Sequence, residues 1–364
     1  MPQQLGDNSV TTDGIARITE TDRDRLSRHV MKKGDIVFSR RGDVTRRAFI
    51  TAKEAGWLCG TGCLLLRIEH PKCDNRFLAR YLSLPSSKTY LEQHAVGATM
   101  PNLNQGILRS VPLRLPPIPT QQAIVGILSA YDDLIANNTR RIKLLEDAAR
   151  LLYEEWFVRL RFPGHEHTPI QDGVPQGWDT KTVSELCETV KDTVDPSRIE
   201  PTTPYIGLEH IPRRSITLAD WGRAEQVESS KHRFVEGDIL FGKIRAYFHK
   251  VGLAMTDGIT SSDAIVIRAN GADQQWLLLM TTSSDQFVRT AAQTAREGSK
   301  MPRADWSVMQ QYRVLIPSRQ ILLSFNDFVE PITRQLKSLA FGIRRATEAR
   351  DLLLPRLMSG EVAV

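Results

Sequence analysis

Apolar residues recur in a 4-3 spacing between Gln121 and Phe157, and the same spacing returns 201 residues further along the chain. This heptad pattern predicts a helix that buries one seam against another helix. A single surface helix can show such a stripe, but a register shared at one offset favours two paired helices. The predicted seam contains Ile124, Leu128, Ile135, Ile142, Leu145, Leu152, Val329, Leu336, Ile343 and Leu353. The polar residues Asn138 and Arg350 interrupt it and are suited to fixing its register.

Short motifs repeat in the segments that precede the two predicted helices. Three pairs carry the repeat: Lys33–Phe38 with Glu236–Phe241, Gly97–Pro101 with Gly298–Pro302, and Leu113–Pro116 with Val314–Pro317. The first pair predicts a turn that feeds a buried strand, and the last predicts a strand that ends at a proline before each helix. Proline at position 331 predicts a kink or a break in the second helix.

The repeat predicts a mixed α/β chain with pseudo-two-fold internal symmetry. Its parts are a globular unit (1–116), a helix (117–160), a Pro/Gly-rich linker with a second globular unit (161–316), and a second helix (317–364). Because the first helix leads from one unit to the other, the second can pair with it only by running back. We therefore expect an antiparallel coiled coil with one globular unit at each end. The second repeat opens with a Trp-containing stretch, 174–186, that we expect the first repeat to lack.

The net charge of +6 is concentrated in residues 1–116, which hold 18 Lys and Arg against 11 Asp and Glu. Such an excess is typical of a surface that faces a polyanion, although a solvated basic face is the alternative. The chain has neither a signal sequence nor a long apolar run, so we expect a cytoplasmic protein without a membrane span. Cys59 and Cys63 have the spacing of half a metal site, but because no second pair accompanies them we predict buried thiols and no metal.

Catalytic motifs are missing. The stretch 237–243 has the glycine and lysine spacing of a phosphate-binding loop, but Ile244 replaces the required Ser or Thr, and the stretch itself is predicted to be a strand. The sequence contains no dinucleotide-binding, zinc-protease, serine-hydrolase or methyltransferase signature. We therefore predict a chain that performs no covalent chemistry.

Basic, amide and aromatic residues follow the repeated strand in each unit, at 39–48 and 242–250, and a second loop follows at 99–105 and 299–305. Arginine pairs with guanine edges, asparagine pairs with adenine, and both cationic side chains bind phosphates. The candidate DNA-binding residues are Arg40, Arg41, Arg46, Arg47, Asn102, Asn104, Lys243, Arg245, Tyr247, Lys250, Lys300 and Arg303. Ordinary turns and surface charges are the alternative.

A second apolar stripe runs along the first helix beside the seam, and a two-helix coil does not need it. Its larger members are Ile127, Leu134, Leu144 and Leu151. Exposed strips of this kind usually mark interfaces, so we predict that these residues bind a partner protein.

These motifs resemble a known family over nearly the whole chain, the DNA sequence specificity (S) subunits of type I restriction-modification systems. The resemblance rests on 34–43, 56–63, 94–104, 116–124, 240–245 and 352–360. It implies two target recognition domains, each of which reads one half of a split site in double-stranded DNA, with the conserved helices as spacers. It also implies docking of two methylation subunits, which bring S-adenosylmethionine, and of restriction and motor subunits. No cofactor is expected in this chain.

From the residues and the resemblance together, we predict a non-catalytic specificity subunit that reads DNA and docks the methylation and restriction subunits. Two rival functions remain from the sequence. One is a coiled-coil scaffold with protein-binding globular ends, which DNA binding that falls steeply with salt would argue against. The other is a self-contained nuclease or methyltransferase.

Overall fold

The computed structural model describes residues 2–97, 99–295 and 300–364. The chain divides into two compact units, of which unit 1 comprises residues 1–133 and 347–364 and unit 2 comprises residues 134–346. Both long helices pass from one unit into the other, so each unit contains a part of each helix. Among the described residues, no helix is long and apolar enough to cross a membrane.

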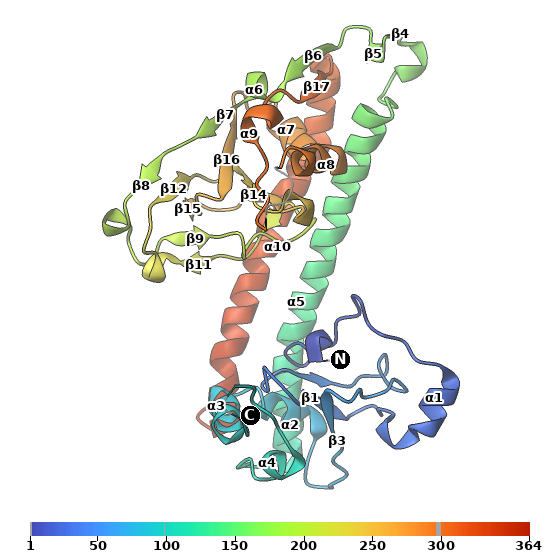
Figure 1. Cartoon of the computed structure of the whole chain (residues 1–364), viewed down its shortest axis with the longest axis vertical. Coiled ribbons are helices and arrows are strands. Elements are labelled where there is room, and N and C mark those ends of the chain that lie inside the picture. Colours follow the sequence, from blue (N-terminus) through green and yellow to red (C-terminus); the bar gives the residue numbers. More distant parts are fainter. Residues whose placement is uncertain (1, 98, 296–299) are drawn as a thin grey trace. The chain divides into compact units, whose positions relative to one another are not determined.

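Unit 1 contains a three-stranded antiparallel sheet in the order β2-β1-β3. Figure 1 labels β1 and β3 of this sheet. Its strands are β1 (Ile36–Ser39), β2 (Arg47–Phe49) and β3 (Cys63–Leu66). Its shorter helices are α1 (Glu20–Arg25), α2 (Asn75–Tyr81), α3 (Pro85–His94) and α4 (Gln105–Arg109), with single 3-10 turns at Pro2–Gln4 and Ser27–His29.

The central strand β1 separates two apolar clusters because alternate side chains point to opposite faces of a strand. Ile36 and Phe38 join the cluster that contains Leu78 and Leu91 of the helices. Val37, on the other face, packs with a cluster that includes Cys59 and Cys63. The continuous apolar run predicted as a buried strand is therefore covered on both sides.

Unit 2 contains two five-stranded sheets, β10-β14-β13-β16-β7 and β11-β9-β15-β12-β8, and two pairs, β17-β6 and β4-β5. The strands are β4 (Ile170–Gln171), β5 (Val174–Pro175), β6 (Asp179–Thr182), β7 (Cys187–Val190), β8 (Thr193–Val194), β9 (Pro204–Ile206), β10 (Thr217–Leu218), β11 (Gly222–Arg223), β12 (Lys231–Phe234), β13 (Ile239–Gly242), β14 (Val251–Ala254), β15 (Gly258–Thr260), β16 (Ala264–Ala269) and β17 (Arg313–Ile316). The shorter helices are α6 (Val183–Leu186), α7 (Gln275–Thr282), α8 (Asp285–Gln293) and α9 (Trp306–Met309).

The internal repeat is a structural repeat. Strands β1, β2 and β3 of unit 1 have the same pairing as β13, β14 and β16 of unit 2. Strand β13 also separates two clusters, with Phe241 on the face of Ile239 and Leu240 on the other. The predicted internal repeat is therefore confirmed at the level of the sheet core.

The long helices are α5 (Ile118–Tyr153), which continues as a π-helical turn over Glu154–Val158, and α10 (Arg319–Ser359). In unit 1 the start of α5, at Ile124 and Leu128, packs against the end of α10, at Leu357. In unit 2 the ring centroids of Trp156, after α5, and Phe325, early in α10, lie 6.0 Å apart. The start of one helix meets the end of the other in both units, so the helices run antiparallel, as predicted.

Every predicted seam residue is buried or half-buried. The polar interruptions have defined partners as well. A Cβ atom on Gly342 of α10 would lie 3.3 Å from the Asn138 amide nitrogen, so the buried Asn138 occupies the space that this glycine leaves. In unit 1, Arg350 Nη1 donates to Asp132 Oδ1 at 2.9 Å, and Arg80 pairs with the same carboxylate.

Helix α10 continues through Pro331, so the predicted break is absent, while the kink stays a prediction. Another prediction about local structure was wrong. The stretch 113–116 forms no strand, whereas its counterpart in unit 2 is β17. Strand β17 pairs with β6 of the Trp-containing opening. Among the described residues of unit 1, no equivalent strand pairs with 113–116.

Candidate nucleic-acid interface

A turn built around a buried aspartate precedes the basic loop in each unit. In unit 1, Arg67 donates to both carboxylate oxygens of Asp35, at 2.9 and 2.6 Å, and the Lys32 amide donates at 2.7 Å. Gly34, at φ 93°, makes the turn in a conformation that favours glycine. These bonds hold the start of β1 and therefore fix where the loop after β1 begins.

Unit 2 repeats the turn almost bond for bond. Arg268 donates to both oxygens of Asp238 at 2.8 Å, and the Val235 amide also donates at 2.8 Å. Gly237 has φ 90°. The carboxylate also raises the pKa of the Arg268 guanidinium through these hydrogen bonds. The Gly-Asp pair that defines the sequence repeat thus forms and holds the turn that precedes each basic loop.

The two candidate loops of unit 1 lie against each other. The Gly42 amide donates to the Pro101 carbonyl at 3.1 Å, and the Leu103 amide donates to the Arg40 carbonyl at 2.9 Å. Because these bonds use main-chain atoms, they do not engage the exposed side chains of Arg40, Arg41 and Met100. The arginine loop and the Met-Pro loop therefore form one surface.

Unit 2 joins its loops in the same way. The Arg245 amide donates to the Pro302 carbonyl at 2.7 Å, and the Ala304 amide donates to the Lys243 carbonyl at 2.8 Å. The repeated residues 298 and 299, like residue 98, lie outside the described residues. We call the two joined loops of each unit its composite loop surface: 39–47 with 99–105 in unit 1, and 242–250 with 300–305 in unit 2.

In unit 1, Arg40, Arg41 and Arg46 are exposed. Arg46 Nε lies 3.4 Å from Asp43 Oδ2, an exposed pair that opens at little cost. Asn102 is half-buried and belongs to the main-chain bridge between the loops. Asn104 uses its side-chain oxygen to cap α4, accepting from the Ile107 amide at 3.0 Å.

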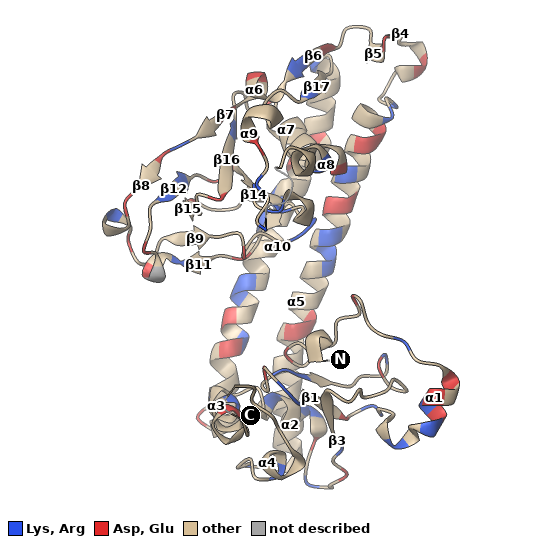
Figure 2. Cartoon of the chain, viewed as in Figure 1, with Lys and Arg blue, Asp and Glu red and all other residues tan. Residues whose placement is uncertain are grey.

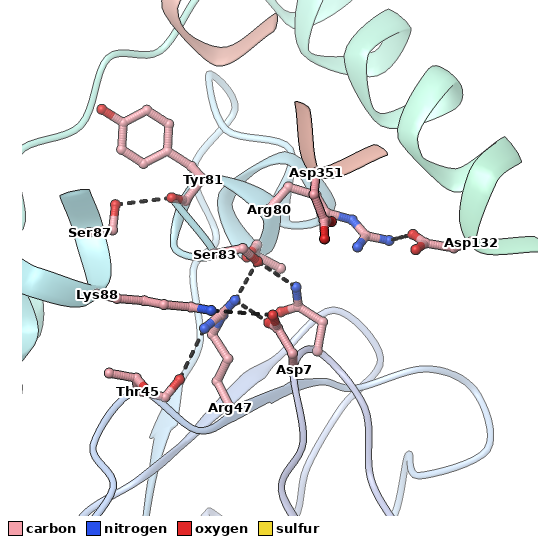
Figure 3. Close-up of polar contacts among 12 residues, drawn as sticks. Asp7, Thr45, Arg47, Arg80, Tyr81, Ser83, Ser87, Lys88, Asp132 and Asp351 are labelled. Carbon is pink, nitrogen blue, oxygen red and sulfur yellow. Dashed lines mark hydrogen bonds and ion pairs between the residues drawn. The ribbon is translucent and has the colours of Figure 1, made fainter. Parts of the chain in front are cut away.

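Arg47 was predicted to bind DNA, and the structure corrects this. It is fully buried, with 0% of its surface exposed. Its guanidinium donates to the Thr45 carbonyl at 3.0 Å and to the side chains of Asp7 and Ser83 (Figure 3). Its Cα lies opposite Phe38 of β1, where an inward side chain enters the core and the guanidinium therefore needs internal acceptors. Arg47 is a structural residue of unit 1.

In unit 2, Tyr247 is 57% exposed and contacts Phe248 edge-on, with centroids 4.8 Å apart. Arg303 and Lys300 are exposed, and Arg303 Nη2 lies 3.4 Å from Asp263. The Arg213 guanidinium sits 3.9 Å over the Phe248 ring and thereby joins this cation-aromatic group. No signal in the sequence marks Arg213, because its position over a ring so distant along the chain follows no local pattern.

The other cations of unit 2 are partly engaged. Lys243 Nζ donates to the Ser262 carbonyl at 2.6 Å, and Arg245 Nη2 donates to the Lys300 carbonyl at 3.2 Å. Lys250 Nζ donates to the Leu208 carbonyl, and burial lowers the pKa of this lysine. These cationic groups shape the composite loop surface. Each must break its hydrogen bond to a carbonyl oxygen before it can bind a ligand.

The predicted partner stripe on α5 is exposed. Ile127 is 37%, Leu134 47%, Leu144 58% and Leu151 58% exposed. Between the apolar positions both long helices carry acidic as well as basic residues, so neither presents a continuous basic face (Figure 2). The stripe is therefore an apolar surface within a mixed-charge one.

Cys59 and Cys63 pack in the apolar cluster around Val37, as predicted for buried thiols. The neighbouring Cys59 thiol lowers the pKa of Cys63. Among the described residues, no group of three or more His, Cys, Asp or Glu side chains could hold a metal ion. Strand β13 occupies most of the stretch that resembles a phosphate-binding loop, so the backbone there is paired in a sheet.

The fold defines an internally repeated α/β protein with two paired helices. The type I restriction modification DNA specificity domain matches residues 7–147. The chain is 23% identical to the type I restriction enzyme MjaIX specificity subunit of Methanocaldococcus jannaschii, over 76% of this chain and 66% of that one. It is 22% identical to the HindI specificity subunit of Haemophilus influenzae, over 92% of this chain and 88% of that one.

Among solved structures, the chain is similar to the S subunit of a type I restriction-modification system from M. genitalium. The TM-score is 0.55 at 15% identity, covering 90% of this chain and 83% of the other. That likeness concerns the fold. The sequence relatives above are specificity subunits of type I restriction-modification systems, and the chain is similar to them over most of its length.

Proposed function

We propose that this chain is the DNA-reading subunit of a type I restriction-modification complex and that each composite loop surface reads one half of a split target. The observation that carries the proposal is the repeated joining of the two loops by main-chain bonds. It gives unit 1 one surface with exposed Arg and Asn side chains, and unit 2 one surface with exposed Lys, Arg and Tyr side chains. Such side chains pair with base edges and phosphates in the grooves of DNA.

The chain acts without catalysis of its own. Binding of S-adenosylmethionine belongs to two methylation subunits, and DNA cleavage belongs to the restriction and motor subunits. The methylation subunits dock on the exposed stripe, which contains Ile127, Leu134, Leu144 and Leu151. The complex works in the cytoplasm, where the DNA is.

The test of DNA reading is charge reversal at Arg40 and Arg41. Fluorescence anisotropy with mixed-sequence duplex should show weaker binding. The slope of log affinity against log salt should fall by about one for each phosphate that no longer pairs with an arginine. Arg23→Glu on α1, an exposed arginine outside the composite loop surface, is the matched control. Unchanged affinity for specific and random DNA in the charge-reversed chain would leave the protein-binding scaffold as the better function.

Base reading by unit 1 is tested in the cell. A methylome of the host with the Arg40→Ala, Arg41→Ala chain should show relaxed specificity in one half-site only, because unit 2 keeps its own loops. Loss of specificity in both halves, or in neither, contradicts the assignment of one half-site per unit.

The helices are proposed to set the gap between the half-sites. Deleting 135–141 together with 336–342 removes one heptad from each helix and keeps the seam. Each helix shortens by about 10.5 Å at 1.5 Å per residue, which is roughly three base pairs. The methylated motif should keep its half-site sequences and lose spacer length, with weaker binding because the duplex also turns by about a third of its repeat. An active enzyme that still modifies only the original spacing contradicts this.

A further inference from the structure

Each unit has its own sheet with the same pairing of three strands, and the two sheets differ at one edge. In unit 2, β7 pairs with β16 and closes that edge. In unit 1, β3 corresponds to β16, because Leu65 faces Val37 in the register in which Val266 faces Leu240. Strand β3 has no partner on its other side within the described residues. The sheet edge is therefore paired at β16 in unit 2, whereas the equivalent edge at β3 in unit 1 has no paired strand among the described residues.

The segment 179–190 covers this edge in unit 2. Strand β6 pairs with β17, and β7 pairs with β16. Between them, the Val183 amide donates to the Tyr312 carbonyl and the Ser184 amide to the Gln310 carbonyl, both at 3.0 Å. Val183 and Leu186 are fully buried at 0% exposure. Backbone pairing and two apolar side chains thus hold the segment in place.

In unit 1 the equivalent positions line an open groove with a cavity volume of about 320 Å³. Its apolar lining includes Leu65, Leu66, Leu108, Val111 and Leu113. Leu113 is 40% exposed, whereas Val314, its counterpart in the sequence repeat, is 5% exposed. The groove is thus lined by counterparts of the residues that unit 2 uses to hold 179–190.

We propose that this groove binds a polypeptide segment with the chemistry of 179–190: a strand that pairs with 113–115, a turn with apolar side chains three positions apart, and a strand that pairs with β3. Addition of a strand to an open sheet edge supplies main-chain hydrogen bonds, while apolar pockets give specificity. The chemistry of this site is independent of DNA binding, so the proposal goes beyond the function above.

The probe is a synthetic peptide of residues 177–191 with a fluorophore, titrated into the full chain. We expect saturable binding with a Kd below ~1 mM. Hydrogen exchange of the β3 amides should slow in the complex, because the edge strand gains a partner. The same peptide with Val183→Asp and Leu186→Asp should bind about tenfold more weakly or not at all, since each carboxylate would enter an apolar site.

Variants of the chain locate the binding. Leu113→Asp should weaken peptide binding about tenfold or more, and because Leu113 is exposed in the free chain the fold is kept. Ile18→Asp, at a residue of unit 1 that is 48% exposed and outside the groove, is the matched control and should bind as the parent chain does.

Three results would overturn the proposal: no saturable binding up to ~1 mM, equal binding of the doubly substituted peptide, or binding that Leu113→Asp leaves unchanged. The last would mean that the peptide exchanges with the native segment in unit 2. DNA affinity, measured in parallel, is expected to stay the same in both chain variants.

Discussion

Replacing Arg47 with alanine tests the distinction between structural and DNA-binding arginines. Only 1% of its side chain is exposed, and its guanidinium has three acceptors within unit 1. Removing a buried side chain of this length costs about 2–5 kcal/mol through lost packing and the cavity left behind. The hydrogen bond to Asp7 adds less than a buried pair would, because the Asp7 side chain is 59% exposed and regains water. We expect a loss of about 4 kcal/mol.

Urea denaturation followed by circular dichroism measures this loss as a lower midpoint for the unit 1 transition. Arg46→Ala is the matched control, since its side chain is 47% exposed and its removal should change stability by less than about 0.5 kcal/mol. Arg47→Met keeps most of the volume and should cost less than alanine. In native buffer, folded Arg47→Ala should bind DNA within about twofold of the parent, whereas Arg41→Ala should bind more weakly.

The opposite pattern would refute this reasoning. An Arg47→Ala chain that unfolds within about 1 kcal/mol of the parent, yet loses about tenfold in DNA affinity, would mean that the guanidinium leaves its buried acceptors when DNA binds. If the Arg47→Ala chain matched the parent in both stability and DNA affinity, the buried hydrogen bonds of Arg47 would contribute little. That result would also refute the structural role of Arg47.

Three further predictions concern the turns, the helix carboxylate and the stripe. Asp35→Ala and Asp238→Ala should each cost about 3 kcal/mol, each in its own unit, because each removes charge-assisted bonds; separate urea transitions would report this. Burial raises the pKa of Glu146, on α5, above its ordinary 4.5, so folded unit 2 holds this proton more tightly and its stability falls as pH rises above 4.5. Glu146→Gln should remove the part of this pH-dependent loss of stability that Glu146 causes, as measured by urea midpoints at several pH values. Ile127→Glu with Leu134→Glu should abolish co-purification of the methylation subunit and leave the circular dichroism spectrum unchanged.

The helix pairing could be predicted from the sequence because its cause is periodic and repeated. A heptad register needs no knowledge of distant contacts, and Leu336 at 0% exposure and Ile124 at 1% are buried as that register requires. The antiparallel direction followed from connectivity alone. The turn around Asp35 was visible for the same reason, since its sequence recurs around Asp238.

The role of Arg47 could not be predicted in this way. It belongs to a run of basic residues, and in sequence nothing separates it from Arg46. What separates them is the alternation of β2, which turns Arg47 inward, and Asp7, which lies 40 positions away and accepts a hydrogen bond from its guanidinium. Arg213 could not be predicted for another reason: it lies outside the two repeated loops, and its place over Phe248 depends on the packing of unit 2.

The strand at 313–316 shows what decides between two similar sequences. Leu113–Pro116 and Val314–Pro317 share an apolar pattern and a closing proline, yet only the second forms a strand. Val314 pairs with Lys181 of β6, and the strand's free amides and carbonyls gain partners there. Leu113 has no such neighbour among the described residues, so its backbone stays irregular and its side chain stays 40% exposed. A local sequence pattern allows a strand to form, and the strand forms only where a second segment pairs with it. Supplying that segment to unit 1 should therefore produce the missing strand, and measuring protection at 113–115 after peptide addition tests this directly.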